Sequence, residues 1–152
     1  MIGTGEMIVR LLVAALLGGL IGLEREYRSK VAGLRTHLLV AIGSALFMLL
    51  SRYGFEGQAD PSRVAAQIVS GIGFIGAGAI IMDRRHSVHG LTTAAGIWVS
   101  AGIGMTVAAG MYALAGVATL LSLVGLEIAV FAFRRPTEDE LNPKSKNADK
   151  TR

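Results

Sequence analysis

The sequence predicts an all-α membrane protein with five transmembrane helices. Hydrophobic residues make up 52% of the 152-residue chain, charged residues only 17%, and the mean hydropathy is +0.54. Uncharged stretches close to the roughly 20 residues that a helix needs to cross a bilayer recur along the chain. The 20 glycines would weaken soluble helices, but they let membrane helices pack closely. The chain has no cysteine, which excludes a disulfide framework and a thiolate metal site.

The five spans follow from where charged or turn-forming residues interrupt the apolar sequence. The first contains only Arg10, whose long side chain is expected to extend outward to the membrane surface, and the second is short but uncharged. The third follows Asp60 and Pro61, which are typical of a helix N-terminus. The apolar stretch that follows is about twice as long as one spanning helix, so we expect a turn at Ala109–Gly110. The predicted spans are residues 7–23, 36–51, 64–82, 91–108 and 111–133 of a transmembrane domain 1–133, with a disordered cytoplasmic tail at 134–152.

The distribution of basic residues predicts the orientation. Residues 24–35 contain four lysines or arginines, residues 83–89 contain two, and the tail contains six. The opposite side has only Arg10, Arg52 and Arg63. Because lysine and arginine are enriched in cytoplasmic loops, we expect the N-terminus outside and the C-terminus in the cytoplasm.

Two parts of the sequence resemble each other. Gly19–Gly22, a charged turn and Gly33–Thr36 are followed 54 and 57 residues later by Gly73–Gly76, a charged turn and Gly90–Thr93. In the predicted topology these are two parallel helical hairpins, with the fifth helix added. The alternative is coincidence in a glycine-rich apolar sequence.

Small residues at helical spacing predict close contacts between helices. Residues 71–76 match the letters of a dinucleotide-binding fingerprint, but no strand precedes them and no acidic residue follows about 20 residues later. Helix packing is therefore the preferred interpretation, and self-association as a dimer is expected on the same grounds. The glycines expected at tight contacts are Gly18, Gly22, Gly71, Gly73, Gly76, Gly78, Gly96 and Gly104.

The densest group of charges follows the first span. If that helix continues, Glu24 faces Arg28 and Glu26 faces Lys30. The group is either a solvated helix end or, together with the neighbouring inner turns, a charged surface that docks another protein. The residues of that predicted docking surface are Glu24, Arg25, Glu26, Arg28, Arg35, His37, Asp83 and Arg84.

Glu127 is the only acidic residue well inside a predicted span, about 10 Å from its inner end. An ionised group at this depth costs on the order of 1 to 3 kcal/mol and usually faces a partner or a wet cavity. It is either a partly hydrated residue or a site for an ion. The three histidines lie near inner ends of spans, but no spacing supplies a carboxylate partner, so neither a metal site nor a cofactor is predicted.

Four segments resemble the signature blocks of the MgtC/SapB family of membrane proteins. They are Gly19–Glu26, Ala32–His37, Ser70–Gly78 and Gly90–Trp98, and the resemblance covers about residues 7–131. It implies a bacterial inner-membrane protein associated with adaptation to low magnesium and, in pathogens, with survival inside phagocytes. It also implies action by binding other membrane proteins, with the rotary ATP synthase as a candidate. The chain resembles the short SapB/YhiD type that lacks a soluble C-terminal domain, which makes virulence and ATP synthase regulation weaker expectations.

These observations favour a non-enzymatic regulatory or interaction protein of the inner membrane. The alternative is a transporter or channel for a small ion such as magnesium or a proton, which the twin hairpins and Glu127 favour and the lack of converging intramembrane carboxylates disfavours. No span presents a nucleophile beside its base, so an enzyme is not expected. The expected partners are the lipid bilayer, other membrane proteins and a second copy. Nucleic acid is excluded because the basic residues lie in short gaps between apolar runs.

Overall fold

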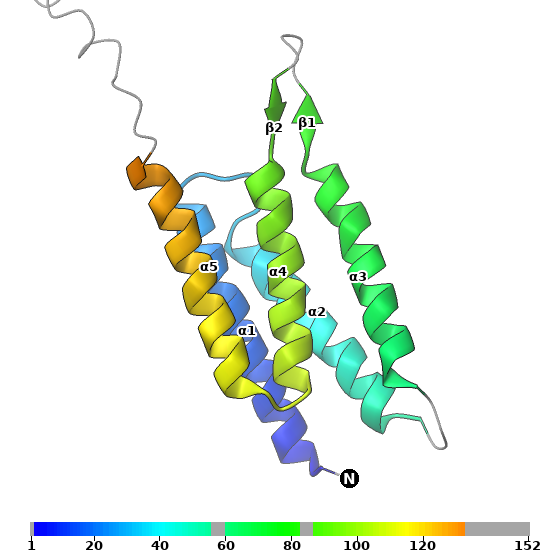
Figure 1. Cartoon of the computed structure of the whole chain (residues 1–152). Coiled ribbons are helices and arrows are strands. Elements are labelled where there is room, and N and C mark those ends of the chain that lie inside the picture. The colour runs from blue at the N-terminus through cyan, green and yellow to red at the C-terminus, as the bar shows by residue number, and fades with distance from the viewer. Residues whose placement is uncertain (1, 56–59, 83–86, 133–152) are drawn as a thin grey trace, which may run out of the picture.

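The computed structural model shows an antiparallel bundle of helices with one short β-hairpin (Figure 1). It describes residues 2–55, 60–82 and 87–132. Within these residues, five helices overlap the five predicted spans, and the all-α membrane fold is confirmed. The helices are α1 (Thr4–Tyr27), α2 (Leu34–Tyr53), α3 (Pro61–Gly78), α4 (Leu91–Ala108) and α5 (Tyr112–Ala132), and strands β1 (Ile81–Met82) and β2 (Val88–His89) pair between α3 and α4.

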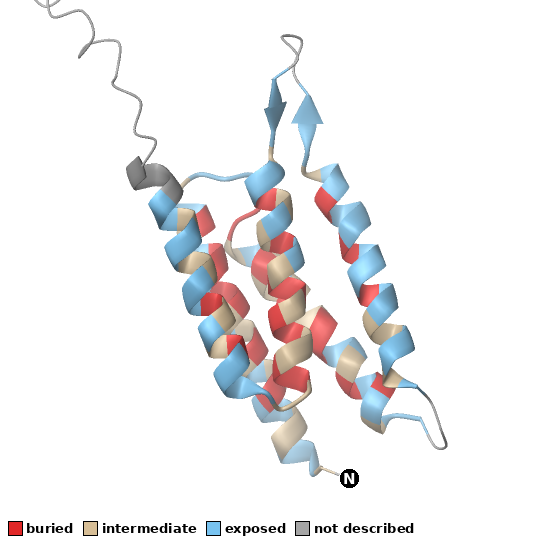
Figure 2. Cartoon of the chain, in the orientation of Figure 1, coloured by how far each residue is buried: buried red, intermediate tan, exposed pale blue. Residues whose placement is uncertain are grey.

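Helix α4 is the centre of the bundle and packs against all four other helices. Helices α1 and α2 pack against α4 and against each other, while α3 and α5 flank α4 on opposite sides (Figure 1). Buried residues therefore concentrate in α1, α2 and α4 (Figure 2). The exposed positions carry many apolar side chains, among them Leu12, Leu16 and Leu120. An apolar exterior of this kind suits a lipid environment.

Three helices, α1, α2 and α4, are long and apolar enough to cross a membrane, and α5 contributes a shorter apolar helix at Tyr112–Ile128. Helix α3 is not among them, because Ser62, Arg63 and Gln67 lower the hydropathy of its 18 residues. Helix α3 lies alongside α2 and α4, as a helix that crosses the bilayer with them would. Its crossing of the bilayer stays a prediction.

The third predicted span ends too late. Helix α3 stops at Gly78, and Ile81 and Met82 pair instead with His89 and Val88. The apolar residues after Gly78 continue the hydrophobic pattern, so the sequence did not show the break. Gly90 permits it, because its φ of +89° is left-handed and a Cβ there would collide with the carbonyl of Ala79. The predicted turn at residues 109–110 is confirmed, with Gly110 at a φ of +85°.

The geometry agrees with two related hairpins. Gly33 and Gly90, 57 residues apart, are the N-caps of α2 and α4. A Cβ on Gly22 would lie 3.1 Å from His37 Cβ, and a Cβ on Gly76 would lie 3.6 Å from Ala94 Cβ. Equivalent glycines therefore contact equivalent positions of the following helix. Helices α1 and α3 also run in the same direction (Figure 1).

Candidate functional site

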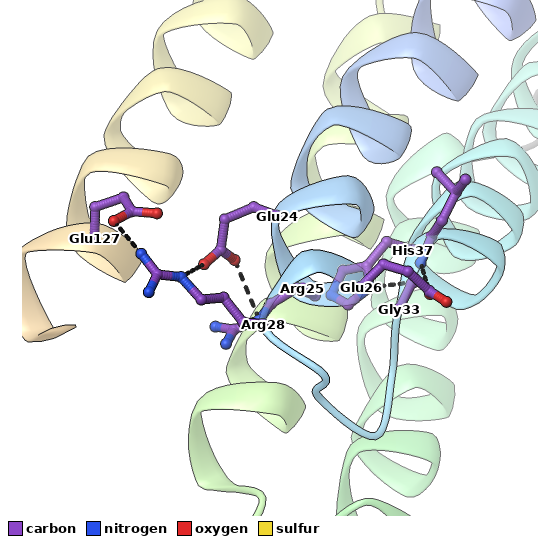
Figure 3. A network of polar contacts seen from close by, with 8 residues as sticks. Glu24, Arg25, Glu26, Arg28, Gly33, His37 and Glu127 are labelled. Atoms are coloured by element: carbon purple, nitrogen blue, oxygen red, sulfur yellow. Dashed lines mark hydrogen bonds and ion pairs between the residues drawn. The ribbon is translucent and has the colours of Figure 1, made fainter.

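A chain of alternating charges lies where α1 ends (Figure 3). Arg28 Nη2 donates a hydrogen bond to Glu127 Oε2 at 2.5 Å, and Arg28 Nε lies 3.6 Å from Glu24 Oε1. The second carboxylate oxygen of Glu24 lies 3.2 Å from Arg25 Nε. We call these four residues the ion-pair chain. It joins the last turn of α1 and its C-cap to α5.

The exposure of the side chains increases along the ion-pair chain from Arg25 to Glu127. The side chains of Arg25 and Glu24 are 5% and 11% exposed, whereas those of Arg28 and Glu127 are 28% and 54% exposed. Its two cations balance its two anions, and the hydrogen bond that Arg28 donates to Glu127 raises the pKa of Arg28. Glu127 therefore has a cationic partner 99 residues away along the chain, which the sequence could not show. The predicted pairing of Glu24 with Arg28 is confirmed.

Glu26 has a different role from the predicted one. Its Oε2 accepts a hydrogen bond from the Leu34 backbone N–H at 3.0 Å and so caps α2, whose N-cap Gly33 has no side chain to do so. A Cβ on Gly33 would collide with this carboxylate. The predicted pairing of Glu26 with Lys30 is wrong, because α1 ends at Tyr27 and Lys30 lies beyond the helix.

His37 is fully buried between α1, α2 and α4. Its Nδ1 lies 2.9 Å from the Gly33 carbonyl oxygen, which can only accept, so Nδ1–H is the donor. Its Nε2 has no hydrogen-bond partner among the described residues and lies 3.1 Å from where a Cβ on Gly96 would stand. The predicted docking surface is therefore wrong for His37 and for Arg25, since both side chains fill the interior.

Exposed side chains remain at the connection between α1 and α2. Tyr27 and Val31 are 87% and 79% exposed, and Lys30 and Arg35 are exposed as well. We call these four residues the turn surface. Sequence reasoning missed Tyr27 and Val31 as part of it, although their apolar character between basic residues was visible. Asp83 and Arg84 of the predicted docking surface lie outside the described residues.

Half of the glycines predicted at tight contacts are confirmed there. A Cβ on Gly104 would meet the Ala41 carbonyl, one on Gly18 would stand 2.9 Å from the His37 carbonyl, and one on Gly22 would stand 2.7 Å from Leu34 Cα. Gly96 faces His37 closely, and Gly76 makes an ordinary contact. Gly71, Gly73 and Gly78 make no close contact within the chain, since nothing lies within 4 Å of where their Cβ atoms would stand, and a contact with a second copy stays a prediction for them. Helix α3 turns another face, with Ile68, Ile72 and Gly76, toward the bundle.

A second polar cluster, missed in the sequence, lies at the opposite end of α1. Arg10 is buried, and its Nη1 donates to the Ala108 carbonyl at 2.6 Å, in the last turn of α4. Its Nε donates to Glu6 Oε1 at 2.9 Å, and the Tyr112 hydroxyl donates to the same oxygen at 2.6 Å. The guanidinium of Arg10 reaches toward the predicted outer end of the bundle, as expected, but it is buried there, because unsatisfied carbonyls at the end of α4 attract a cation.

The described residues contain no group of three or more His, Asp or Glu side chains that could hold a metal ion. A cleft of about 250 Å³ lies between α1, α4 and α5, next to the turn of α5 that carries Glu127. Its lining is mostly apolar, with Ile21, Gly96 and Gly125 among its residues.

Comparisons with known proteins give a consistent result. The sequence profile of the MgtC family matches residues 11–134. The chain is 52% identical over 132 residues to "Putative magnesium transporter YhiD" of Escherichia coli (strain K12), which covers 82% of this chain and 61% of that protein. It is also 52% identical to Protein MgtC of Brucella abortus (strain 2308) over 123 residues, covering 81% of this chain and 49% of that protein. Protein MgtC of Salmonella typhimurium (strain LT2) is 52% identical over 116 residues, covering 76% and 49%.

The chain thus spans about half to three-fifths of the length of these curated relatives. No solved structure matches it.

Proposed function

The chain belongs to the MgtC family, and on that premise we propose that it is a non-enzymatic protein of the bacterial inner membrane that regulates another membrane protein by binding it. The family resemblance adds a role in adaptation to low magnesium and, in pathogens, in survival inside phagocytes. The rotary ATP synthase is one candidate partner. These proposals concern the membrane region that the chain shares with its longer relatives.

The observation that carries the proposal is the closed ion-pair chain. Glu127, for which an ion site was one of two interpretations, is paired with Arg28, and Glu24 is shared between Arg28 and Arg25. The negative charges of both carboxylates are thereby balanced by arginines of the ion-pair chain. An arrangement of this kind stabilises the joint between α1 and α5 and leaves no free pair of carboxylates there for a cation to bind.

The turn surface supplies the proposed contact with a partner. It combines an aromatic ring and an aliphatic side chain with the two cations of Lys30 and Arg35. Tyrosine and arginine are enriched in protein interfaces, and tyrosine also suits the membrane–water boundary. The complementary partner is an acidic segment of a membrane protein at the same boundary.

Charge reversal at the turn surface tests the regulator. We expect Lys30→Glu to weaken recovery of the partner about tenfold or more, because a like charge then faces an acidic segment. Complementation of a deletion strain under magnesium limitation should fail while membrane abundance stays normal, since Lys30 is exposed. The matched control is Arg63→Glu, an exposed base at the other end of the bundle. Normal complementation by Lys30→Glu would contradict the proposal.

The alternative function is transport of a small ion, which the cleft beside Glu127 and the name of one relative, "Putative magnesium transporter YhiD", favour. For a regulator we expect purified protein in liposomes to give no flux of magnesium, protons or potassium under an imposed gradient. For a transporter we expect a flux that Glu127→Gln eliminates, because the substitution removes the charge at nearly constant shape. A flux that depends on Glu127 would contradict the regulatory proposal and support transport.

Thiol labelling tests the proposed orientation. The chain has no native cysteine, so Ser29→Cys and Ser62→Cys report on opposite ends of the bundle, and both positions are exposed. We expect an impermeant reagent to label Ser62→Cys in spheroplasts and Ser29→Cys only after lysis, because the basic residues gather on the side of Ser29. The reverse pattern would invert the topology. Equal labelling of both positions before lysis would show that the preparation is leaky, so intact spheroplasts are verified first with a cytoplasmic marker.

A further inference from the structure

A groove of about 590 Å³ lies on the outside of the bundle between α2 and α3. It is lined by Leu39, Gly43 and Phe47 of α2 and by Gln67, Gly71 and Ile75 of α3, among others. We call it the α2–α3 groove. At Gly43 and Gly71 nothing lies within 4 Å of where a Cβ would stand, so the described residues leave its central part uncovered.

The rest of α3 is as open as the groove. Only Ile68, Ile72 and Gly76 of this helix are buried, and the remainder is half-buried or exposed (Figure 2). Phe74 is 85% exposed and lies one turn from Gly71. Helix α3 therefore presents a large aromatic side chain next to a position that has no side chain at all.

Gln67 indicates what covers this face. It lines the groove together with Ser44 and Phe47, which lie in the middle of α2, and α2 is apolar enough to span the membrane. Gln67 is exposed, and its amide has no hydrogen-bond partner among the described residues. An amide in hydrocarbon without a partner costs roughly 2 kcal/mol or more. A lipid tail in the groove would leave that cost in place.

A second copy of the chain removes this cost. An amide both donates and accepts hydrogen bonds, so two Gln67 side chains complement each other. A two-fold axis along the membrane normal places residues of the same number at the same depth, which brings the two amides together. Helical side chains lean toward the N-terminus of their helix, so the ring of Phe74 from a second copy reaches the depth of Gly71.

We propose that the chain forms a two-fold symmetric dimer in which α3 of each copy covers the α2–α3 groove of the other. The two Gln67 amides pair near the axis, and Phe74 of each copy packs over Gly71 of the other. This inference rests on the proposed crossing of the bilayer by α3. It does not depend on the turn surface or on the partner that the turn surface binds.

Cysteine cross-linking in native membranes tests the interface. Ser70 is exposed on α3 between Gln67 and Phe74, and Ser70→Cys changes one atom. We expect oxidation to give a covalent dimer, because a disulfide requires Cα atoms within about 7 Å and the axis brings the two α3 helices together. The control is Leu16→Cys, which is 61% exposed in the middle of α1 and should stay monomeric. Cross-linking of Leu16→Cys to the same extent as Ser70→Cys would overturn the proposal. Cross-linking of neither variant would also overturn it, and would indicate that lipid fills the α2–α3 groove.

Filling the groove gives an independent measurement. Gly71→Leu and Gly116→Leu both place a side chain where nothing lies within 4 Å, so both should fold. We expect only Gly71→Leu to become monomeric in native nanodiscs, and Gln67→Leu to weaken the dimer by about three- to thirtyfold. A dimeric Gly71→Leu, or a monomeric wild type, would overturn the proposal. Failure of complementation by Lys30→Glu in a protein that remains dimeric reports on the regulatory proposal alone.

Discussion

Replacing Gly104 with alanine should remove most of the protein from the membrane. A Cβ at this position would collide with the backbone carbonyl of Ala41, which cannot move unless the whole of α2 shifts. Helices α2 and α4 would have to separate along their tightest contact. Overpacking of this kind costs about 1 to 3 kcal/mol and occasionally more, a large share of the stability of a small domain. The measurements are membrane abundance and the thermal unfolding midpoint in mild detergent.

The same substitution at Gly102 is the matched control. Gly102 lies on the same helix, but nothing comes within 4 Å of where its Cβ would stand. Both substitutions gain the same helix propensity, so the difference between them isolates the contact with Ala41. Equal abundance and equal midpoints for the two variants would show that α2 and α4 are not in close contact at Gly104.

The second large effect is expected for Arg25→Glu, which should prevent folding rather than disturb a surface. Arg25 is 4% exposed, and its Nε lies 3.2 Å from Glu24 Oε2. The substitution removes a buried cation and places two carboxylates side by side in the interior. Loss of one partner of a buried ion pair typically costs about 3 to 5 kcal/mol. The protein should be degraded and nearly absent from the membrane fraction.

Lys30→Glu is the comparison for this prediction as well. It makes the same change of charge five residues after Arg25, at an exposed position in the connection between α1 and α2. Its abundance should stay close to wild type, because exposed charges contribute little to folding. An abundant Arg25→Glu variant that fails only in complementation would restore Arg25 to the docking surface.

The fold was largely predictable because apolar runs and turn residues mark membrane helices directly. The break at residues 109–110 and the helix start after Asp60 both appeared as expected, and Asp60 Oδ1 accepts the capping hydrogen bond from Ser62 N–H at 2.9 Å. The end of α3 was not predictable, because Ile81 and Met82 are as apolar as the helix before them. Their pairing with β2 depends on residues beyond the loop.

The candidate site was predictable in its residue types but not in its geometry. Glu24, Arg25 and Arg28 were recognised as one group, yet helical spacing alone does not show which of them faces the interior. The partner of Glu127 was hidden because ion pairs between distant helices leave no local pattern. Small residues likewise show where two helices can approach closely, but not whether a neighbouring helix lies there. Gly104 has a close neighbour in α2, whereas Gly73 has none within the chain.

The pairs at the two ends of α1 have a consequence for biogenesis. Glu6 and Arg28 of the first helix region bond to Tyr112 and Glu127, which lie 106 and 99 residues later. During synthesis the first helix enters the membrane long before these partners leave the ribosome, so Glu6 and Arg28 have at that stage only the nearby partners Arg10 and Glu24. Each end of the first helix is completed only by the last. A chain interrupted before α5 therefore lacks the hydroxyl that bonds to Glu6 at one end of α1 and the carboxylate that bonds to Arg28 at the other, so each end of the bundle stays incomplete until synthesis is finished.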